Sequence, residues 1–386
     1  MRKEKNREYY FDIHSLAFCP NLRGMLLNEY LFPLSAAPLE KDEKLLVSLD
    51  DLKRAFAGVL EFTVVRDEVT AAGKSGAGRA PFYLENGLEL VDVSALMLHF
   101  GWKRYEGFGP ENMKTILLTE DKETTVFPRR FAMTMEVLVR GKKEGDLRRT
   151  FFFEEGGRVV PYHIYLPTCI EEGEKLPVIF WLHGGKGNAE QGFRLSKNML
   201  QFYAEENRMI VVGVDGYIRD AAYGYPYPAN PGDPDIDYSC PENPGHFSEE
   251  RLERARLAER CLEETIKEIL ENYPADPDRK FLFGHSMGCI GTFWFASTHP
   301  DMFRALVACG AMLNPRLMDI SPLKKQSILF VGGTEDGHGF DYLRNGIMYL
   351  EKEGFDIRHI YVGGGEHSDG WSLVLDRIYA FLKQHC

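Results

Sequence analysis

The sequence predicts an α/β protein, in which a mostly parallel sheet of eight strands has helices on both faces and follows a small α+β domain. Two observations lead to this prediction. From about Leu147 onward, short apolar runs alternate with amphipathic stretches, as in a parallel sheet covered by helices. The first 140 residues lack this alternation. The chain of 386 residues is long enough for two domains, which we place at 1–140 and 147–386.

The expected strands of the second domain follow one another along the chain. RRTFFFEE (148–155) and VVPYHIYLP (159–167) form a predicted hairpin around a Gly-Gly turn. The clearest helix spans 248–273, with Ser248 as its N-cap and Pro274 as its stop. The remaining apolar runs each end in Gly, Asp or His, and they are PVIFWLHGG, MIVVGVDG, KFLFGHS, ALVACG, SILFVGG and IRHIYVGGG.

The first domain contains a weak internal duplication. LLVSLDDLKRAFAG (45–58) and ELVDVSALMLHFGW (89–102) both read as a short strand, a polar residue, an amphipathic helical turn and a glycine. TAAGKSGAGRAPF (70–82), between the two copies, is expected to be a mobile loop. The segment ENGLELVDVSALMLHFG resembles the small repeat domains known as copper-amine-oxidase N-terminal-like domains, which generally carry no copper. We expect a packing or oligomerisation module.

Composition excludes some classes of partner. The net charge of -12 argues against binding to nucleic acid or to an anionic membrane surface. No run of about 20 apolar residues predicts a membrane span. The seven cysteines show no CxxC spacing, and we interpret them as free thiols in a reducing compartment. No apolar segment of a signal peptide follows the basic N-terminus, so a cytoplasmic location is expected.

The pentapeptide Gly284-His285-Ser286-Met287-Gly288 lies between a predicted strand and a predicted helix over 287–298. It fits G-x-S-x-G, the pattern of a nucleophile elbow, where a serine occupies a strained strand-to-helix turn. Larger side chains next to the serine would collide in such a turn, which explains the glycines. We therefore interpret Ser286 as a nucleophile. The alternative is a glycine-rich turn that serves packing alone.

An acid and a base are expected after later strands. Asp336 follows SILFVGG, and Glu335 beside it is the fallback. His367 follows the last strand and three glycines, and we interpret it as the base. His338 is the competing base, whereas His359 falls within a strand and is expected to be structural. The chain order nucleophile, acid, base is that of α/β-hydrolases and differs from the orders of chymotrypsin and subtilisin.

A turn that follows the strand PVIFWL is a candidate oxyanion hole. His183-Gly184-Gly185 would present backbone amides to a substrate carbonyl oxygen there. The amide of Gly185 or Lys186 is the expected first donor, and that of Met287 is the second. The alternative is an ordinary turn.

A long segment rich in tyrosine and proline follows Val214 and continues to Phe247, as functional loops often do. Its tyrosines are candidates for a pocket that suits an aromatic or sugar-linked ester, or they only stiffen a surface loop. Trp371 is expected either to border the site or to pack against a helix. The candidate substrate-binding residues are His183, Gly184, His285, Tyr223, Tyr225 and Trp371, and Tyr217 and Tyr227 belong to the same tyrosine group.

With these motifs, residues 147–386 resemble the α/β-hydrolase superfamily. PVIFWLHGGKGNAEQGF and DPDRKFLFGHSMGCIGTFWFASTHPDMFRALVACGA are most similar to the branch with feruloyl esterases, polyhydroxybutyrate-depolymerase-like proteins and esterase-D-type enzymes. Cys289 departs from that branch, which usually has a second glycine there. The small side chain should preserve the elbow. The resemblance implies acyl transfer to water through a serine ester, without metal or cofactor.

The leading hypothesis is a serine carboxylic-ester hydrolase that acts on a small or medium soluble ester. A serine peptidase of the prolyl-oligopeptidase type shares the core, but roughly 140 preceding residues are too few for its usual propeller. A non-catalytic binder of this fold would lack the nucleophile, the acid or the base. Ser286, Asp336 and His367 fill all three of these positions. The expected partners are a small-molecule ester and, through the first domain, a second copy of the chain.

Overall fold

The computed structural model describes residues 13–108, 112–120, 144–168, 170–218, 221–226, 249–311 and 319–386. These residues form two compact units, and the second comprises Glu144–Asp146 and Tyr162–Cys386. Leu147–Pro161, which we had assigned to the second domain, groups with the N-terminal unit. Two contacts explain this grouping: Arg149 pairs with Leu31 of an N-terminal strand, and Val159 joins the hydrophobic cluster of that unit.

The N-terminal unit contains strands of two sheets. Within this unit, one has the strand order β10-β11-β1-β2-β3-β12, and the other has the order β4-β5-β9-β8-β7-β6. Its elements are β1 (Ser15–Phe18), β2 (Gly24–Leu27), β3 (Tyr30–Pro33), β4 (Leu39–Lys41), β5 (Lys44–Ser48), α1 (Leu49–Ala55), β6 (Leu60–Val65), β7 (Glu68–Gly73), β8 (Gly76–Glu85), β9 (Leu88–Asp92), α2 (Val93–His99), β10 (Lys103–Phe108), β11 (Lys114–Thr119) and β12 (Gly145–Phe153).

The two copies of the duplicated sequence pattern adopt the same strand–helix arrangement. In the first, β5 leads into α1 and the Ser48 side chain caps the helix. In the second, β9 leads into α2 and the Asp92 carboxylate accepts hydrogen bonds from the amides of Ser94 and Ala95. Strands β5 and β9 pair antiparallel, so the two copies lie side by side in opposite directions.

The segment expected to be a mobile loop, TAAGKSGAGRAPF, instead forms most of the paired strands β7 and β8, so this expectation was wrong. Its small residues have a packing role. A Cβ atom at Gly78 would lie 2.8 Å from the Phe100 ring and 3.1 Å from the Leu96 carbonyl oxygen. Glycine in this strand therefore allows the segment around α2 to approach closely.

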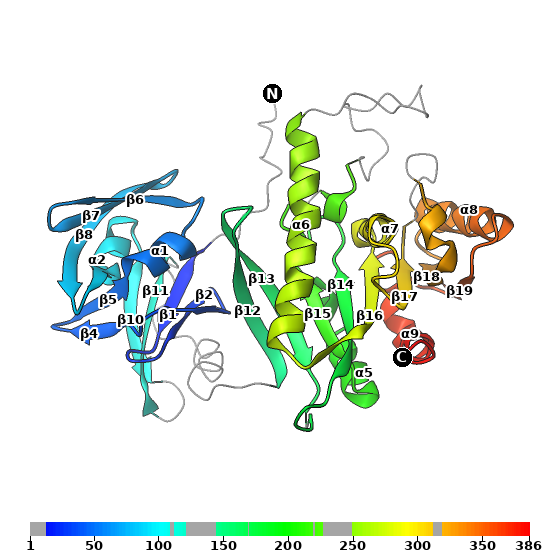
Figure 1. The fold of residues 1–386 in the computed structure, drawn as a ribbon, viewed down its shortest axis with the longest axis horizontal. Helices are drawn as coiled ribbons and strands as arrows, with labels where there is room; N and C mark the ends of the chain where they lie inside the picture. The colour runs from blue at the N-terminus through cyan, green and yellow to red at the C-terminus, as the bar shows by residue number, and fades with distance from the viewer. Residues whose placement is uncertain are drawn as a thin grey trace. The chain divides into compact units, whose positions relative to one another are not determined.

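The C-terminal unit is built on a sheet with the order β13-β15-β14-β16-β17-β18-β19 (Figure 1). Strand β13 runs antiparallel to β15, and all later neighbours are parallel. Its elements are β13 (Arg158–Leu166), β14 (Leu176–Leu182), α4 (Gln191–Leu195), α5 (Met199–Asn207), β15 (Ile210–Val214), η2 (Ala222–Gly224), α6 (Glu249–Asn272), β16 (Ala275–His285), α7 (Met287–Thr298), β17 (Ala305–Cys309), η3 (Ser321–Lys325), β18 (Ser327–Gly333), α8 (His338–Lys352), β19 (Ile357–Val362), η4 (Gly370–Val374) and α9 (Leu375–Lys383).

Counted along the chain from β13, the strand order of this sheet is 1-3-2-4-5-6-7. The predicted mostly parallel α/β sheet is therefore confirmed, and the first of its eight predicted strands, β12, lies mostly in the N-terminal unit. The predicted helix over 248–273 is observed as α6, and its expected N-cap Ser248 lies outside the described residues. Among the described residues, no helix is both long and apolar enough to span a bilayer.

Helices cover both faces of this sheet (Figure 1). Every residue of β14 is buried, which requires apolar neighbours on both sides. Ile179 and Trp181 join a cluster with Phe193 of α4, Leu200 of α5 and Ile378 of α9. Helices α6 and α7 contact the sheet as well, and α7 starts directly at the end of β16.

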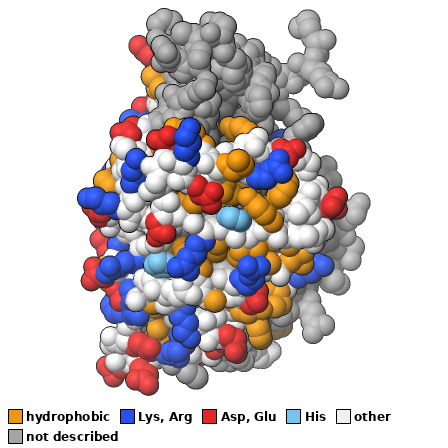
Figure 2. Space-filling model, turned by 90° about the vertical axis from the view of Figure 1, so that its right-hand side faces the viewer, with side chains coloured by type: hydrophobic (Ala, Val, Ile, Leu, Met, Phe, Trp, Pro, Cys, Tyr) orange, Lys and Arg blue, Asp and Glu red, His pale blue; other side chains and the backbone are white. Residues whose placement is uncertain are grey.

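Figure 2 views the side of this unit that carries α8 and β19 and shows apolar side chains among Lys, Arg, Asp and Glu. The exposed large apolar residues of these two elements are Tyr342, Met348, Tyr349 and Tyr361.

Candidate active site

Three side chains meet at the carboxyl ends of the parallel strands. Ser286 follows β16, Asp336 follows β18 and His367 follows β19. Ligands and catalytic groups collect at this edge in open α/β sheets, because the loops after parallel strands emerge together there.

The three groups form one line of hydrogen bonds. Nε2 of His367 lies 2.9 Å from Oγ of Ser286, and Nδ1 of His367 lies 2.8 Å from Oδ2 of Asp336. With its Nδ1–H donating to the carboxylate, the neutral ring leaves Nε2 free to accept the serine proton. The Asp336 side chain is 8% exposed and that of His367 is 45% exposed, so the carboxylate is shielded and the imidazole is partly open to solvent.

The fallback acid Glu335 and the strand residue His359 lie outside this line of hydrogen bonds. Glu335, the fallback acid, is exposed, and its backbone amide donates to the carbonyl of Gly365. His338, the competing base, begins α8. His359 lies within β19 and stacks on Tyr361.

Ser286 has the backbone geometry of an elbow. Its φ is 54° and its ψ is -118°, which are strained values for a residue with a side chain. A Cβ at Gly284 would lie 2.0 Å from the Gly288 carbonyl oxygen, and a Cβ at Gly288 would lie 2.1 Å from that of Leu182. Only glycine fits at both positions. The Ser286 amide donates to the carbonyl of Cys309 at 2.8 Å, which ties the turn to the neighbouring strand.

The loop after β14 contains three glycines with different surroundings. The amide of Gly184 donates to Oε1 of Gln191 at 2.7 Å, and that of Gly187 donates to the Gly184 carbonyl at 3.0 Å. Among the residues that the structure describes, the amides of Gly185 and Lys186 have no acceptor, and both residues are exposed. Lys186 adopts a left-handed φ of 61°. These two amides remain the available donors in the loop.

The second candidate donor is the amide of Met287. It is the first residue of α7, where a helix offers amides without intrahelical acceptors. The positive end of the helix dipole lies at the same place, which favours a developing negative charge there.

Two buried side chains support this loop. The His183 amide donates to the Tyr223 hydroxyl at 2.7 Å, and Nε2 of His183 accepts from the Gly216 amide at 3.0 Å. Tyr223 is fully buried. His183 and Tyr223, which we expected to bind substrate, therefore support the loop from the protein interior.

Two further candidates for the pocket, Tyr225 and Trp371, are buried in the same way. Tyr225 is 4% exposed and packs edge-on against Trp294, with ring centroids 5.9 Å apart. Trp371 is 2% exposed and packs against Trp181 and Phe283. Both aromatic rings belong to the core. Of the other tyrosines in this group, Tyr217 is buried and Tyr227 lies outside the described residues.

His285, also expected at the substrate surface, is buried under the site. It is 4% exposed, and its Nε2–H donates to the backbone carbonyl of His367 at 2.7 Å. Burial lowers its pKa to about 4, so the ring is neutral near pH 7. Gly184, the remaining candidate, is buried, and a Cβ there would lie 3.2 Å from the Cβ of Ser286.

Comparisons with known proteins find one family model and several relatives. Residues 154–335 match the family model Esterase, described as "Putative esterase". The S-formylglutathione hydrolase of Mus musculus is 29% identical over 160 residues, which cover 40% of this chain and 53% of the mouse protein. The chain thus spans about half the length of this curated relative.

Two solved structures are similar at low identity. The S-formylglutathione hydrolase of Agrobacterium tumefaciens has 18% identity and a TM-score of 0.47, over 63% of this chain and 97% of that one. A ferulic acid esterase from Anaeromyces mucronatus has 17% identity and a TM-score of 0.43, over 63% and 93%. The strand order and the elbow geometry decide the fold. The C-terminal unit is an α/β-hydrolase domain.

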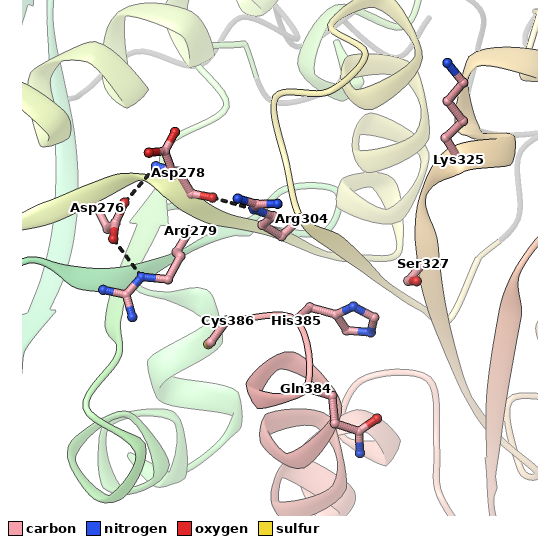
Figure 3. Close-up of a pocket in the computed structure, with 9 residues that line it drawn as sticks. All are labelled: Asp276, Asp278, Arg279, Arg304, Lys325, Ser327, Gln384, His385 and Cys386. Atoms are coloured by element: carbon pink, nitrogen blue, oxygen red, sulfur yellow. Dashed lines mark hydrogen bonds and ion pairs between the residues drawn. The ribbon is translucent and has the colours of Figure 1, made fainter.

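The α/β-hydrolase domain also has a depression of about 670 Å³ at the opposite edge of its sheet (Figure 3). Arg279 binds the Asp276 carboxylate there, and Arg304 donates to the Asp278 carbonyl. The depression is remote from the strand ends that carry the triad. Its lining residues are Asp276, Asp278, Arg279, Arg304, Lys325, Ser327, Gln384, His385 and Cys386.

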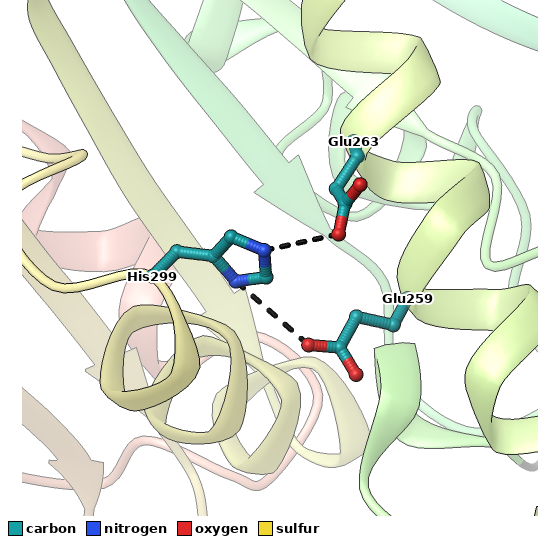
Figure 4. Close-up of side chains that lie close together, drawn as sticks. All are labelled: Glu259, Glu263 and His299. Atoms are coloured by element: carbon teal, nitrogen blue, oxygen red, sulfur yellow. Dashed lines mark hydrogen bonds and ion pairs between the residues drawn. The ribbon is translucent and has the colours of Figure 1, made fainter.

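One cluster in this α/β-hydrolase domain has metal-ligating residue types (Figure 4). Nε2 of His299 lies 3.0 Å from Glu263, and its Nδ1 lies 3.1 Å from the Phe295 carbonyl. Glu259 accepts from Trp294 and Thr298. Because protein groups already satisfy these atoms, we interpret the cluster as a polar tie between α6 and α7.

Proposed function

We propose that the protein is a serine carboxylic-ester hydrolase that acts on a small or medium soluble ester through an acyl-enzyme intermediate. The observation that carries the proposal is the hydrogen-bonded line from Ser286 through His367 to Asp336. A serine hydroxyl is a weak nucleophile until an adjacent base removes its proton, and this line supplies the base and a carboxylate that orients it.

In the proposed reaction, Ser286 attacks the ester carbonyl while His367 takes the hydroxyl proton. Asp336 fixes the imidazole tautomer and stabilises the imidazolium that forms. His367 then protonates the leaving alcohol. Water repeats the sequence on the acyl-enzyme, again with His367 as the base, and the carboxylic acid leaves.

The oxyanion formed in both steps is assigned to backbone amides. The Met287 amide is one donor, and the amide of Gly185 or Lys186 is the other. Each such donor stabilises the transition state by roughly 3 kcal/mol. Nucleophile, base and oxyanion donors all come from the chain, so the proposed reaction needs neither a metal nor a cofactor.

A thioester is the second candidate substrate. The similarity to S-formylglutathione hydrolase of mouse favours it, because that protein's name denotes a thioester of a very small acyl group. The same attack and oxyanion stabilisation serve both carbonyl types. Two of the tyrosines on which the prediction of an aromatic pocket rests, Tyr223 and Tyr225, are buried.

The test is a substrate panel with a nucleophile control. We expect hydrolysis of nitrophenyl esters of short and medium acyl chains, and of acyl thioesters, with loss of turnover in Ser286→Ala. Aminoacyl anilides form the peptidase arm, and long-chain emulsions form the lipase arm. Ester turnover that survives Ser286→Ala would refute the assignment, and activity confined to anilides would point to the peptidase.

We further propose self-association through the N-terminal unit and a cytoplasmic location. Exposed apolar side chains on its second sheet support self-association, among them Val65 at 59% and Leu84 at 70% exposure. Among the described residues, the free cysteines Cys19, Cys261, Cys289, Cys309 and Cys386 support a reducing compartment. Light scattering of wild type and of the double variant Val65→Lys, Leu84→Lys tests the association. A monomer at all concentrations would contradict it.

A further inference from the structure

His285 connects two parts of the triad directly. It is the last residue of β16, next to Ser286, and its Nε2–H donates to the main-chain carbonyl of His367. The distance is 2.7 Å across 82 residues of sequence. The acceptor belongs to the base itself, so this bond acts on the backbone that carries the reacting imidazole.

The start of the loop that carries His367 is held by other hydrogen bonds, because the Glu335 amide donates to the Gly365 carbonyl and the Gly364 amide donates to Oγ1 of Thr334. At the base itself, the His285 bond holds the loop. The loop begins with Gly363, Gly364 and Gly365, which resist bending of the backbone least of all residues. The His367 side chain is 45% exposed, so packing covers only part of it. On its inner side lie the His285 ring, with centroids 5.1 Å apart, and Gly310, where a Cβ would be 3.4 Å from the His367 ring.

The chemical state of His285 suits an anchor and excludes proton transfer. A carbonyl acceptor requires Nε2 to carry the hydrogen. Nδ1 is buried with no hydrogen-bond partner among the described residues, and a Cβ on Gly184 would lie 3.3 Å from it. A second proton on Nδ1 would therefore be buried and unpaired, which is unfavourable. The ring remains a neutral donor while His367 gains and loses its proton.

We propose that His285 is a positioning residue that holds the base His367 in reach of Ser286 through this hydrogen bond. The inference rests on the proposed function and adds a residue to it. Displacement of a catalytic group by about 1 Å can lower the rate by about 10²-fold. Loss of the anchor should therefore lower kcat and leave KM nearly unchanged, because His285 does not touch the substrate.

Two amide substitutions separate the anchor from general packing. In His285→Gln the side-chain nitrogen takes the place of Nε2 and can still donate to the His367 carbonyl. In His285→Asn it takes the place of Nδ1, faces Gly184 and cannot reach that carbonyl. We expect kcat for a nitrophenyl ester to fall by about 10²-fold in His285→Asn and only a few-fold in His285→Gln. The exposed His359→Gln should match wild type.

A second readout follows the base itself. The downfield proton resonance of the His367 Nδ1–H should persist in wild type and His285→Gln and broaden in His285→Asn. Equal kcat values in the Asn and Gln variants would overturn the inference. Nitrogen chemical shifts of the unmodified protein give a test that does not depend on folding of a variant, because a His285 ring protonated on Nδ1 would also overturn it.

The same experiments distinguish the two proposals. Turnover that is independent of Ser286 would defeat the proposed function. If turnover requires Ser286 but kcat is equal in His285→Asn and His285→Gln, only the positioning role would be refuted.

Discussion

The amide of Gly184 donates to Oε1 of Gln191 at 2.7 Å, and this contact fixes the loop that carries the candidate oxyanion donors. The Gln191 side chain also fills the space beside Gly187, where a Cβ would lie 2.7 Å from its oxygen. A loop with free amides at Gly185 and Lys186 is thus held by a helix residue that takes no part in the reaction.

Gln191→Leu should therefore impair catalysis without a direct effect on the triad. The buried Gly184 amide loses its acceptor, at a cost of about 1–3 kcal/mol, and the loop can relax away from the oxyanion position. We expect kcat to fall about 10-fold, because part of one donor's contribution is lost. Steady-state kinetics measures the change. Arg194→Leu, one turn along and exposed, is the control, and an equal loss there would contradict the explanation.

Alanine at adjacent glycines should have opposite outcomes. A Cβ at Gly184 would lie 3.2 Å from the Ser286 Cβ and 3.3 Å from the His285 ring, whereas a Cβ at Gly185 has no heavy atom within 4 Å. Gly184→Ala should lower kcat/KM by about 10-fold or more as it displaces the nucleophile. Gly185→Ala should remain near wild type. Similar kinetics for the two variants would argue against the crowding at residue 184.

The choice of acid is testable by a matched pair. Asp336→Asn keeps the shape but favours the wrong tautomer of His367, and we expect kcat to drop by about 10³–10⁴-fold. Glu335→Gln removes a neighbouring exposed charge and should change kcat little. Single-turnover acylation measures both. A larger effect at residue 335 would transfer the role to that carboxylate.

Stability should fall on mild acidification because of His285. Its folded-state pKa is about 4 and its ordinary value is 6.5, so between these values the unfolded chain binds a proton that the folded chain excludes. Stability therefore rises with pH in this window. The contribution is full above 6.5, and about 2 kcal/mol is lost between about pH 7.5 and about pH 5.

Urea unfolding at the two pH values checks this prediction. His285→Gln does not titrate, so its stability should fall less over the same interval. The rings that face His285 are those of His367 and Trp371. An equal fall in both proteins would show that other groups carry the pH dependence.

The described cysteines should differ sharply in reactivity. Burial raises the pKa of the Cys261, Cys289 and Cys309 thiols, which suppresses the reactive thiolate. Cys386 is exposed. In the folded protein, iodoacetamide should label Cys386 first, and the four buried thiols, those of Cys19, Cys261, Cys289 and Cys309, should react only after denaturation. Peptide mass spectrometry gives the order, and early labelling of Cys289 would indicate an open elbow.

The strands and the elbow could be predicted because their signals are local. Each parallel strand is a short apolar run that ends in a small or polar residue, and the elbow needs glycines at fixed positions. Ser286, Asp336 and His367 were chosen by their places after such strands, and the structure brings their side chains together. Residue type and chain order suffice for that choice, since loops after parallel strands share one edge.

The supports of the site could not be predicted in this way. Gln191 acts on Gly184 from the next helix, and nothing in its neighbourhood distinguishes it from an exposed helix residue. Tyr223 and Trp371 looked like pocket residues because aromatic side chains suit both pockets and cores, and only packing separates the two. A glycine-rich strand of the N-terminal unit was predicted as a loop for a different reason, because glycine and alanine runs are more typical of loops than of paired strands.

The division of the chain has a practical consequence for dissection of the protein. Asp146 belongs to the hydrolase unit although Leu147–Pro161 does not, and its carboxylate binds Nε2 of the buried His163 at 2.8 Å and the Gln201 amide at 3.3 Å. A fragment cut to begin at Leu147, or released by proteolysis at residue 161, would lose that carboxylate. The excised hydrolase would then contain a buried histidine without its carboxylate partner, so separate expression should retain residues 144–146.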